Sequence, residues 1–458
     1  MGYVLINESI LSSIGNILRS KLNTNISYPT SMMYNEISKI NATHIDIIKN
    51  DPDIPIYSSV SSITDLNPLY KKMVQPLNLT LTISGSIPDA YHSSWFDDFV
   101  NNLNLSIPNC TAIGNDAFRY CDCISSIDLP NCNYIGSSAF YSCGGLHNIS
   151  APNCSYIGES AFYSCGGLHN ISAPNCSYIG HEAFADCGLY NISIPNCSYI
   201  DSRAFYNCNL TNTCVQNILD TYISYSTTCP NAFNFCTNIK SLNLTSYISI
   251  SNYAFEGCDS LSSINISSCY IGNGAFYGCY DLRHINLYDC TYIGDYAFHG
   301  CDNLAISSDL PNCSYIGSYA FAYANMWGLS ADNCTYIGDY AFENCSNLYS
   351  ISIPNCTYIG NYAFDDCTSL SSVIILSTSV PSTGVNIFNN TPFDDDYTPD
   401  QEEGYYDDYG NYIEPDPIIG SIYVLPSMVN TFKASPYWSE YASKITSYIE
   451  NMFSTEEE

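Results

Sequence analysis

The side chains of this sequence that could carry chemistry are its 24 cysteines, 7 histidines, 42 tyrosines and 44 acids. Thiolates, imidazoles and carboxylates are the groups that catalysis and metal binding use most often. An enzyme would need several of them gathered at a place that interrupts any regular pattern. The spacing of these residues is therefore more informative than their number.

The cysteines form two regular series and no compact cluster. No Cys-x-x-Cys pair occurs, and Cys121 and Cys123 are the only closely spaced pair, so a zinc site of usual ligand spacing is not indicated. Free cysteine packs as a small buried hydrophobe, so we expect buried reduced thiols, with a disulfide framework and metal binding as the alternatives. The first series is Cys121, Cys143, Cys165, Cys187, Cys208, Cys236, Cys258, Cys279, Cys301, Cys345 and Cys367, and the second is Cys110, Cys132, Cys154, Cys176, Cys197, Cys269, Cys290, Cys313, Cys334 and Cys356.

The histidines and the familiar catalytic motifs give no enzyme signature. His-Glu-x-x-His, Gly-x-Ser-x-Gly and Gly-Lys-Ser/Thr are all absent. His147 and His169 occupy one duplicated position, so they are expected to form a ladder and not a site. We therefore predict a non-enzymatic protein without a cofactor; a hydrolase that acts through an acidic segment is the alternative.

Acids dominate the charge of the chain. Asp and Glu outnumber Lys and Arg by 44 to 12, which gives a net charge of −32 and argues against nucleic acid or an anionic membrane as a partner. A run of acids without a base lies between residues 394 and 416, and such a block is usually a solvated loop. Its residues Asp394, Asp395, Asp396 and Asp400 could hold calcium, although their spacing does not fit an EF-hand loop.

The tyrosines are the best candidates for a binding site. If they are exposed, tyrosines at one repeated position form a stripe that can stack on sugars or fill protein pockets at low entropic cost; if they point inward, they belong to the core. We favour partial exposure. This tyrosine stripe consists of Tyr134, Tyr156, Tyr178, Tyr199, Tyr292, Tyr315, Tyr336 and Tyr358.

An internal repeat organises the chain. The residues AFYSCGGLHNISAPNCSYIG of Ala139–Gly158 recur unchanged at Ala161–Gly180. Relaxed copies keep the Ala-Phe pair about every 22 residues, a period typical of solenoids. One copy cannot bury its apolar face, but stacked copies can. Segments such as Leu146–Ile149 and Leu348–Ile353 are predicted to be short parallel strands, and the glycine of Tyr-Ile-Gly is expected to have a positive φ.

The repeated motif resembles that of a known family. Ile-Gly-x-x-Ala-Phe-x-x-Cys, followed by x-x-Leu-x-x-Ile-x-x-Pro, is similar to the BspA-like leucine-rich repeat. The resemblance implies a leucine-rich repeat solenoid over residues 103–388, with about 12 turns of ~22 residues. It also implies a general-purpose binding scaffold, which bacteria, some protists and phages use.

The region before the repeats has two expected parts. Residues 1–50 are predicted to be a small helical attachment or docking unit, with Ile10, Ile14 and Ile17 on one helical face. The motifs Ile-x-x-Ile-Gly-x-x-Leu-Arg-Ser-Lys and Tyr-Pro-x-x-Met-x-x-x-Ile in this unit resemble the opening of tail-associated proteins of phages and prophages of gut Firmicutes. Residues 51–102 are expected to be a linker and N-terminal cap, with a strand at Leu77–Ile83.

Three further segments interrupt or follow the repeats. Asn209–Pro230 is an insertion with helical spacing, and residues 389–417 are the expected acidic loop. Residues 418–458 resemble the closing segment found after BspA-like repeats, which implies an α/β C-terminal cap. In that cap we expect a strand after Gly420, a helix at Ser427–Lys433 and a second helix at Trp438–Phe453.

These observations favour a surface-recognition protein. We expect a phage tail-associated host-binding protein, located in the virion tail, that attaches to other tail proteins through residues 1–50 and meets a host cell-surface glycan or protein with its solenoid. Self-association stays open, and no membrane insertion is expected. The opening residues lack the basic start and long apolar core of a secretory signal, which favours this reading. The alternative is a cell-surface or secreted BspA-like adhesin of a bacterium or protist.

Overall fold

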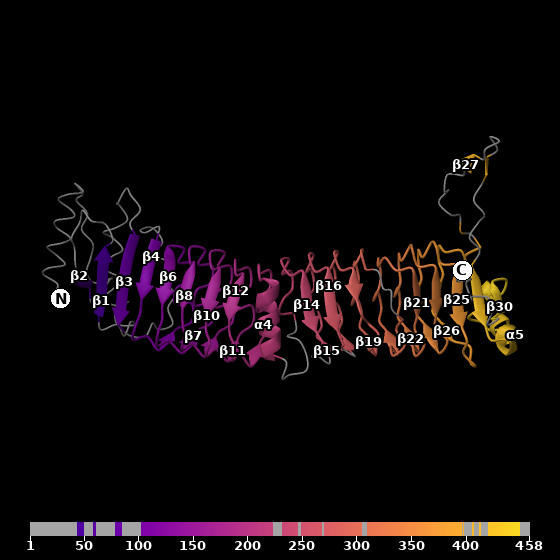
Figure 1. The fold of residues 1–458 in the computed structure, drawn as a ribbon, viewed down its shortest axis with the longest axis horizontal. Helices are drawn as coiled ribbons and strands as arrows, with labels where there is room; N and C mark the ends of the chain where they lie inside the picture. The colour runs from indigo at the N-terminus through magenta and orange to yellow at the C-terminus, as the bar shows by residue number, and fades with distance from the viewer. Residues whose placement is uncertain are drawn as a thin grey trace, which may run out of the picture. The chain divides into compact units, whose positions relative to one another are not determined.

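The repeats fold into stacked turns of a parallel-strand β-solenoid, as the sequence predicts. The chain divides into two compact units, Met1–Tyr222 and Ile223–Glu458, in which successive strands lie side by side (Figure 1). The two units together contain about 14 turns, with repeats about 22 residues apart. This computed structural model describes residues 44–49, 58–60, 78–84, 102–222, 231–245, 249–267, 270–304, 309–395, 397, 405–406, 412–413 and 420–448.

A typical turn contains two short strands separated by a Pro-Asn corner. In one turn these are β8 (Asn148–Ser150) and β9 (Tyr156–Ile157). In each of them the isoleucine is buried, while its neighbours face outward to differing extents. The period-2 alternation of a strand thus places one β-branched side chain in the core from each side of the turn. The sequence predicted the first strand of this pair but not the second.

In unit 1, each of the two strands of a turn joins its own sheet. The first sheet has the order β12-β10-β8-β6-β4-β3-β1-β2 and the second β13-β11-β9-β7-β5. Pairing is parallel except at β1, which pairs antiparallel with both β3 and β2. The remaining strands are β1 (His44–Lys49), β2 (Ser58–Val60), β3 (Asn78–Ser84), β4 (Asn102–Ser106), β5 (Ala112–Ile113), β6 (Ile124–Asp128), β7 (Tyr134–Ile135), β10 (Asn170–Ser172), β11 (Tyr178–Ile179), β12 (Asn191–Ser193) and β13 (Tyr199–Ile200).

Unit 2 repeats this arrangement with four sheets. Their orders are β14-β16-β18, β15-β17-β19-β20-β22-β24-β26, β21-β23-β25-β29-β30 and the short antiparallel pair β27-β28. The strands are β14 (Ser241–Leu244), β15 (Ser249–Ile250), β16 (Ser263–Ile266), β17 (Tyr270–Ile271), β18 (His284–Ile285), β19 (Tyr292–Ile293), β20 (Tyr315–Ile316), β21 (Gly328–Ser330), β22 (Tyr336–Ile337), β23 (Ser350–Ser352), β24 (Tyr358–Ile359), β25 (Ser372–Ile375), β26 (Ser382–Thr383), β27 (Tyr405–Tyr406), β28 (Tyr412–Ile413), β29 (Ser421–Val424) and β30 (Ile445–Ser447).

The third side of each turn, around the Ala-Phe pair, is not a strand. It carries two residues with left-handed backbone, such as Ser138 (φ 55°) and Ser142 (φ 56°), and most of these residues are not glycine. The Phe140 N–H donates to the carbonyl of Ala161 at 2.7 Å, and the Ser142 N–H to that of Tyr163 at 2.6 Å. Hydrogen bonds therefore also run from turn to turn on this side, which offsets the cost of the left-handed residues.

The glycine of Tyr-Ile-Gly does not have the expected positive φ, so that prediction is wrong. Gly158 lies outside the left-handed region, whereas Ser160, two residues later, has a φ of 50°. A Cβ on Gly158 would lie only 2.6 Å from the backbone nitrogen of Ser137 in the preceding turn. Glycine at this place lets successive turns approach closely, although Asp201 and Ser251 occupy the equivalent position in two other turns.

A ladder of phenylalanine rings fills the centre of each unit. Phe140 and Phe162 stack with ring centroids 5.2 Å apart and planes 2° apart, and both rings are fully buried. The members in unit 1 are Phe118, Phe140, Phe162, Phe184 and Phe205, and in unit 2 Phe233, Phe255, Phe276, Phe298, Phe321, Phe342, Phe364 and Phe388. Each repeat therefore stacks its ring on the rings of its neighbours, as expected of a solenoid.

The two cysteine series flank this ladder as buried thiols. Every cysteine in the described residues is free and buried, which confirms the expectation of reduced thiols there. In the first series, Cys165 Sγ donates to the carbonyl of Phe140, one turn earlier, at 3.0 Å. In the second, Cys154 Sγ donates to the carbonyl of Tyr156 at 3.2 Å. Burial raises the pKa of the Cys154 thiol to about 11.

The helices outside the repeats agree with prediction in two places. Within the insertion, α4 (Asn212–Tyr222) packs on β12, where the Ile192 N–H donates to Cys214 Sγ at 3.2 Å. In the C-terminal region, η4 (Pro426–Met428) and α5 (Val429–Lys433) form the expected helical segment. None of the helices in the described parts of the chain is long and apolar enough to cross a bilayer.

The expected second C-terminal helix is wrong over the residues that the structure describes. Trp438 is followed by the 3-10 turn η5 (Ser439–Tyr441) and then by β30, which pairs parallel with β29. The unpaired edge of β29 provides a partner for this segment, and Ile445 continues the buried row of Ile422. The buried Trp438 indole donates to the carbonyl of Pro381 at 2.8 Å and closes this end of the core.

The structure tests only part of what was predicted for the N-terminal region. His44–Lys49, inside the predicted helical unit, form strand β1, so the helical interpretation is wrong for these residues. The rest of residues 1–50 lie outside the described residues. The predicted strand at Leu77–Ile83 is confirmed as β3, which pairs parallel with β4.

Candidate functional site

The tyrosine stripe lies on the second strand of each turn, where tyrosine faces outward and isoleucine inward. In unit 1 the Cα partners run Tyr134, Tyr156, Tyr178 and Tyr199 across β7, β9, β11 and β13. The exposed fraction reaches 36% for Tyr134 and 46% for Tyr199, and the two rings between them are half-buried. The stripe therefore has the partly exposed geometry that the sequence suggested.

Neighbouring rings of the stripe stack almost in parallel. The centroid distances in unit 1 are 4.9, 4.6 and 5.0 Å, with interplanar angles of at most 8°. In unit 2 the distances from Tyr270 through Tyr292, Tyr315 and Tyr336 to Tyr358 are 4.5, 4.6, 4.7 and 5.0 Å. Each interior ring covers the faces of its neighbours, so the stripe presents ring edges and hydroxyl groups to solvent. This geometry differs from the open faces that sugar stacking requires.

Tyr270 belongs to the stripe, although the sequence analysis did not include it. It pairs with Tyr292 across β17 and β19. In its repeat, the residue that normally separates cysteine from tyrosine is missing, so the spacing reads Cys-Tyr-Ile-Gly. The signal that could have found it was the Tyr-Ile-Gly triplet itself.

Burial raises the pKa of several tyrosines of the stripe. Burial, followed by the nearby Tyr270 and Tyr315, raises the pKa of Tyr292 to about 12. Burial is also the main cause of the raised pKa of Tyr315, with the Asp295 carboxylate as the next contributor. At neutral pH Tyr292 and Tyr315 thus keep their O–H groups beside the Asp295 carboxylate.

A second tyrosine ladder follows the corner before the Ala-Phe pair in unit 2. These corner tyrosines are Tyr296, Tyr319, Tyr340 and Tyr362, with centroid distances of 4.8, 4.8 and 5.1 Å. All four have left-handed backbone, with φ between 52° and 57°. The sequence analysis missed them, although Gly-x-Tyr-Ala-Phe in four consecutive repeats is a readable signal.

The asparagines of the Pro-Asn corners serve the turns. Asn153 Nδ2 donates to the carbonyl of Pro130 at 2.7 Å, and Asn175 Nδ2 to that of Pro152 at 3.0 Å. Each amide thus bonds to the corner of the preceding turn. This role explains why an Asn-Cys-Ser/Thr pattern recurs through the repeats.

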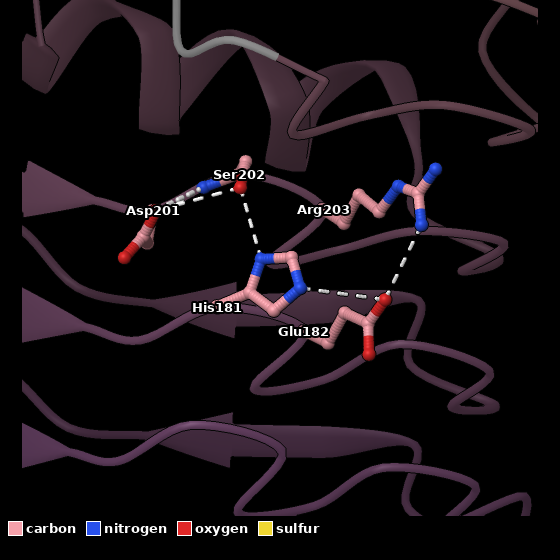
Figure 2. Close-up of polar contacts among 5 residues, drawn as sticks. All are labelled: His181, Glu182, Asp201, Ser202 and Arg203. Atoms are coloured by element: carbon pink, nitrogen blue, oxygen red, sulfur yellow. Dashed lines mark hydrogen bonds and ion pairs between the residues drawn. The ribbon is translucent and has the colours of Figure 1, made fainter.

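A polar network connects two consecutive turns of unit 1, directly after β11 and β13 (Figure 2). His181 Nδ1 lies 2.9 Å from Ser202 Oγ, and His181 Nε2 lies 3.5 Å from Glu182 Oε1. Arg203 Nη1 also lies 3.5 Å from this oxygen. The Ser202 N–H donates to Asp201 Oδ1 at 2.7 Å. Serine, histidine and carboxylate thus meet here, which raises the question of a hydrolase.

The corresponding positions in other turns indicate a structural role for this network. Where His181 stands, Asn115 and Asp339 each accept, through Oδ1, the backbone N–H of the equivalent residue one turn later, in both cases at 2.8 Å. His181 makes the same connection between turns through the Ser202 hydroxyl. The network is therefore a side-chain variant of a link that the solenoid uses elsewhere.

The calcium candidates fall at the end of the repeats. Asp394 Oδ2 accepts the Asn390 N–H at 3.3 Å, and Asp395 Oδ1 lies 3.6 Å from Lys444 Nζ. Asp396 and Asp400 lie outside the described residues. Among the residues that are described, no group of three or more His, Cys, Asp or Glu is arranged to hold a metal ion. Calcium binding by the four aspartates stays a prediction.

Together, the stacked two-strand turns and their outward tyrosine rows define a leucine-rich repeat solenoid. The chain belongs to the BspA type leucine rich repeat family, whose six-copy repeat region matches residues 91–212, 212–327 and 269–394. This confirms the family resemblance read from Ile-Gly-x-x-Ala-Phe-x-x-Cys.

The chain is similar to several solved structures of leucine-rich repeat proteins. One from Bacteroides ovatus is 21% identical, with a TM-score of 0.41 over 66% of this chain and 91% of that one. A leucine rich cell surface protein from Faecalibacterium prausnitzii is 18% identical, with a TM-score of 0.36 over the same shares of 66% and 91%. The pneumococcal vaccine antigen PcpA is 13% identical, with a TM-score of 0.41 over 82% of this chain and 94% of that one. No curated protein matches the chain.

Proposed function

We propose that this protein is a non-enzymatic surface-recognition protein of a phage tail, whose solenoid binds a host cell-surface glycan or protein. The observation that carries the proposal is the tyrosine stripe. It is a repeated, partly exposed row of aromatic side chains. The core does not require these rings, because Ile, Phe and Cys already fill it in each turn. Tyrosine offers both apolar area and a hydroxyl at low entropic cost, which suits recognition.

The geometry of the stripe determines how it would bind. Its hydroxyls recur from turn to turn with the stacked rings, whose centroids are 4.5 to 5.0 Å apart. A partner that lies along them would accept or donate hydrogen bonds at each turn and would bury the ring edges. Affinity would come from many equal contacts, as expected when identical sites are repeated on a rigid scaffold.

The virion location is supported by the resemblance of residues 1–50 to the opening of phage tail-associated proteins. Mass spectrometry of purified virions from the source culture tests it. Peptides from residues 1–50 and from the solenoid are expected in stoichiometric amounts with known tail proteins. Detection of the protein only in the cell envelope would contradict the tail location.

A cell-surface adhesin of the same family is the second candidate. The observation that favours it is the family itself, together with the name of the Faecalibacterium prausnitzii structure as a cell surface protein. Surface labelling of intact source cells with a membrane-impermeant amine reagent separates the two candidates. Labelled protein on cells that release no virions is the result expected of the adhesin.

A further inference from the structure

Two aromatic side chains on the first-strand side of unit 2 differ from all the tyrosine ladders. Trp327 and Tyr349 occupy the same position in consecutive turns, directly before β21 and β23. The Tyr349 N–H donates to the carbonyl of Trp327 at 2.8 Å, so the two residues are immediate neighbours across the turns. Their exposed fractions are 65% and 55%. We call this pair the aromatic platform.

The two rings of the aromatic platform are largely exposed and do not stack on other rings that the structure describes. Every ring in the tyrosine stripe is stacked on at least one other ring, whereas neither Trp327 nor Tyr349 contacts another aromatic ring among the described residues. Trp438, by contrast, is fully buried in the C-terminal core. Tryptophan is usually well buried, and a largely exposed one next to an exposed tyrosine is an unusual apolar surface that points to a ligand.

A row of small residues crosses the strands that follow the platform residues. Gly328, Ser350, Ser372 and Ser421 are Cα partners across β21, β23, β25 and β29. Gly328 has no side chain, and a Cβ there would lie 3.1 Å from Ser350 Oγ. The two large rings are therefore next in sequence to a row of small residues, of which Ser372 is buried and Gly328 and Ser350 are partly exposed.

Several polar groups close in sequence to the rings form few hydrogen bonds or none within the described residues. Asn347 Nδ2 donates to Asn325 Oδ1 at 2.8 Å, and this is the one hydrogen bond of either amide within the described residues. The Ser350 hydroxyl makes none there, and the Ser372 hydroxyl is buried without a hydrogen-bond partner. The amides of Asn325 and Asn347 and the Ser350 hydroxyl thus keep hydrogen-bonding capacity within a few residues of the rings, whereas the Ser372 hydroxyl is not accessible to a ligand.

Charge is missing from the platform, although the chain as a whole carries a net charge of −32. Residues 324–331, 346–354 and 368–377, which form this surface over three turns, contain no Asp, Glu, Lys, Arg or His. The nearest acid in sequence, Asp332, already accepts the Ser330 hydroxyl at 2.8 Å, and these segments themselves offer a charged ligand no partner. An uncharged ligand with an apolar face and many hydroxyl groups would find both an aromatic surface and hydrogen-bonding groups.

We propose that Trp327 and Tyr349 bind a neutral pyranose ring of a glycan. The C–H face of the sugar packs on the exposed indole ring, and the sugar hydroxyls bond to the amides of Asn325 and Asn347 and the hydroxyl of Ser350. The inference goes beyond the proposed function, because the platform belongs to a different sheet from the tyrosine stripe and assigns one ligand class to one site.

Unit 1 shows why the platform is confined to unit 2. The corresponding positions there hold His147, His169 and Tyr190. His169 packs on His147 at 6.1 Å and on Tyr190 at 5.7 Å, and Asn170 Nδ2 donates to the Tyr190 hydroxyl at 2.8 Å. These rings use their faces and polar groups on one another, so the sequence position alone does not make a site.

The test is calorimetric titration of the full chain with neutral oligosaccharides: maltohexaose, cellohexaose, laminarihexaose, mannohexaose and chitohexaose. At least one is expected to bind, and Trp327→Ala is expected to weaken that binding by roughly 10-fold or more, since a stacked tryptophan is a typical binding hot spot. Trp327→Phe, which keeps a flat ring, is expected to retain part of the affinity. Tyr288→Ala removes another exposed ring of unit 2 (56% exposed) and should bind like the wild type.

Two results would overturn the inference. One is the absence of binding to every sugar of the panel. This holds also if a separate screen of peptides finds one that binds at Trp327. The other is equal sugar affinity of the wild type and a Trp327→Ala variant whose circular dichroism and thermal unfolding are unchanged. Neither result bears on the tyrosine stripe, whose variants are assayed separately on cells.

Discussion

Tyr156 and Tyr178 stack with their ring centroids 4.6 Å apart and their planes 3° apart. They come from the two identical copies of the repeat and are direct Cα partners in parallel strands. The ring spacing is close to the spacing of hydrogen-bonded strands, so the backbone itself imposes the stack. A parallel solenoid thereby converts one repeated residue into a continuous, partly exposed surface.

The close approach of successive turns predicts a sharp contrast between two glycines of one repeat. A Cβ at Gly158 would lie 2.6 Å from the Ser137 backbone nitrogen, whereas at Gly166 it would meet nothing within 4 Å. Gly158→Ala is expected to destabilise unit 1 by about 1–3 kcal/mol through overpacking against backbone. Gly166→Ala is the matched control and should leave the urea midpoint nearly unchanged; equal effects of both would refute the close-approach explanation.

The phenylalanine ladder predicts a large effect of a single truncation. Phe162 stacks between Phe140 and Phe184 at 5.2 Å on both sides and is fully buried. Phe162→Ala should destabilise the protein by about 3–5 kcal/mol, because it leaves a cavity that rigid turns cannot close. Phe162→Leu should cost clearly less. Urea unfolding curves measure both, and a loss below ~1 kcal/mol for the alanine variant would contradict the ladder's role.

The buried thiols predict a strong dependence of reactivity on folding. All cysteines in the described residues are buried, and burial raises the pKa of thiols such as Cys154 and Cys313 to about 11. These cysteines should resist iodoacetamide at neutral pH in the native protein and react fully in denaturant. Ser172→Cys adds an exposed thiol as a control that should react at once. Rapid labelling of Cys154 in the native state would contradict their burial.

The same thiols predict alkaline instability. The folded-state pKa values of Cys154, Cys197 and Cys313 are raised from the ordinary 9.0 to about 11. Because the folded state keeps the proton longer, stability is full below pH 9 and falls as pH rises from about 9 to about 11, where the unfolded thiols ionise first. The pKa of Tyr292 is raised from 10.0 to about 12, so its ionisation continues the loss of stability at higher pH. Unfolding midpoints that stay constant between about pH 8 and pH 11 would contradict this.

The fold was predictable from sequence to the extent that it depends on the repeat. The Ala-Phe period gave the stacking direction, and the regular cysteines indicated the thiol ladders, because a repeated residue must meet its own copies. The left-handed residues were not predictable, since most of them are not glycine, as Ser138, Tyr296 and Asp116 show. Turn-to-turn hydrogen bonds, which no local pattern encodes, hold them in place.

The structures of the chain ends and of the candidate binding surfaces were harder to predict from the sequence than the repeats. The sequence pattern around Ile445 predicted a helix, but this segment forms strand β30, which pairs with the edge of β29. The positions of the stripe were correct, yet the closure of its ring faces depends on stacking distances that only the structure gives. Trp327 stands out in the sequence as a rare residue, but its exposure and the small residues beside it become evident only in three dimensions.

The most direct test of the proposed recognition role is the binding of fluorescently labelled protein to intact gut Firmicutes cells by flow cytometry. The decisive variant replaces Tyr315, Tyr336 and Tyr358 with threonine, which keeps strand propensity but removes the rings; Tyr288→Thr is the control. The account predicts that the triple variant loses cell binding by about 10-fold or more while the control keeps it. Wild-type binding by a folded triple variant would contradict the account.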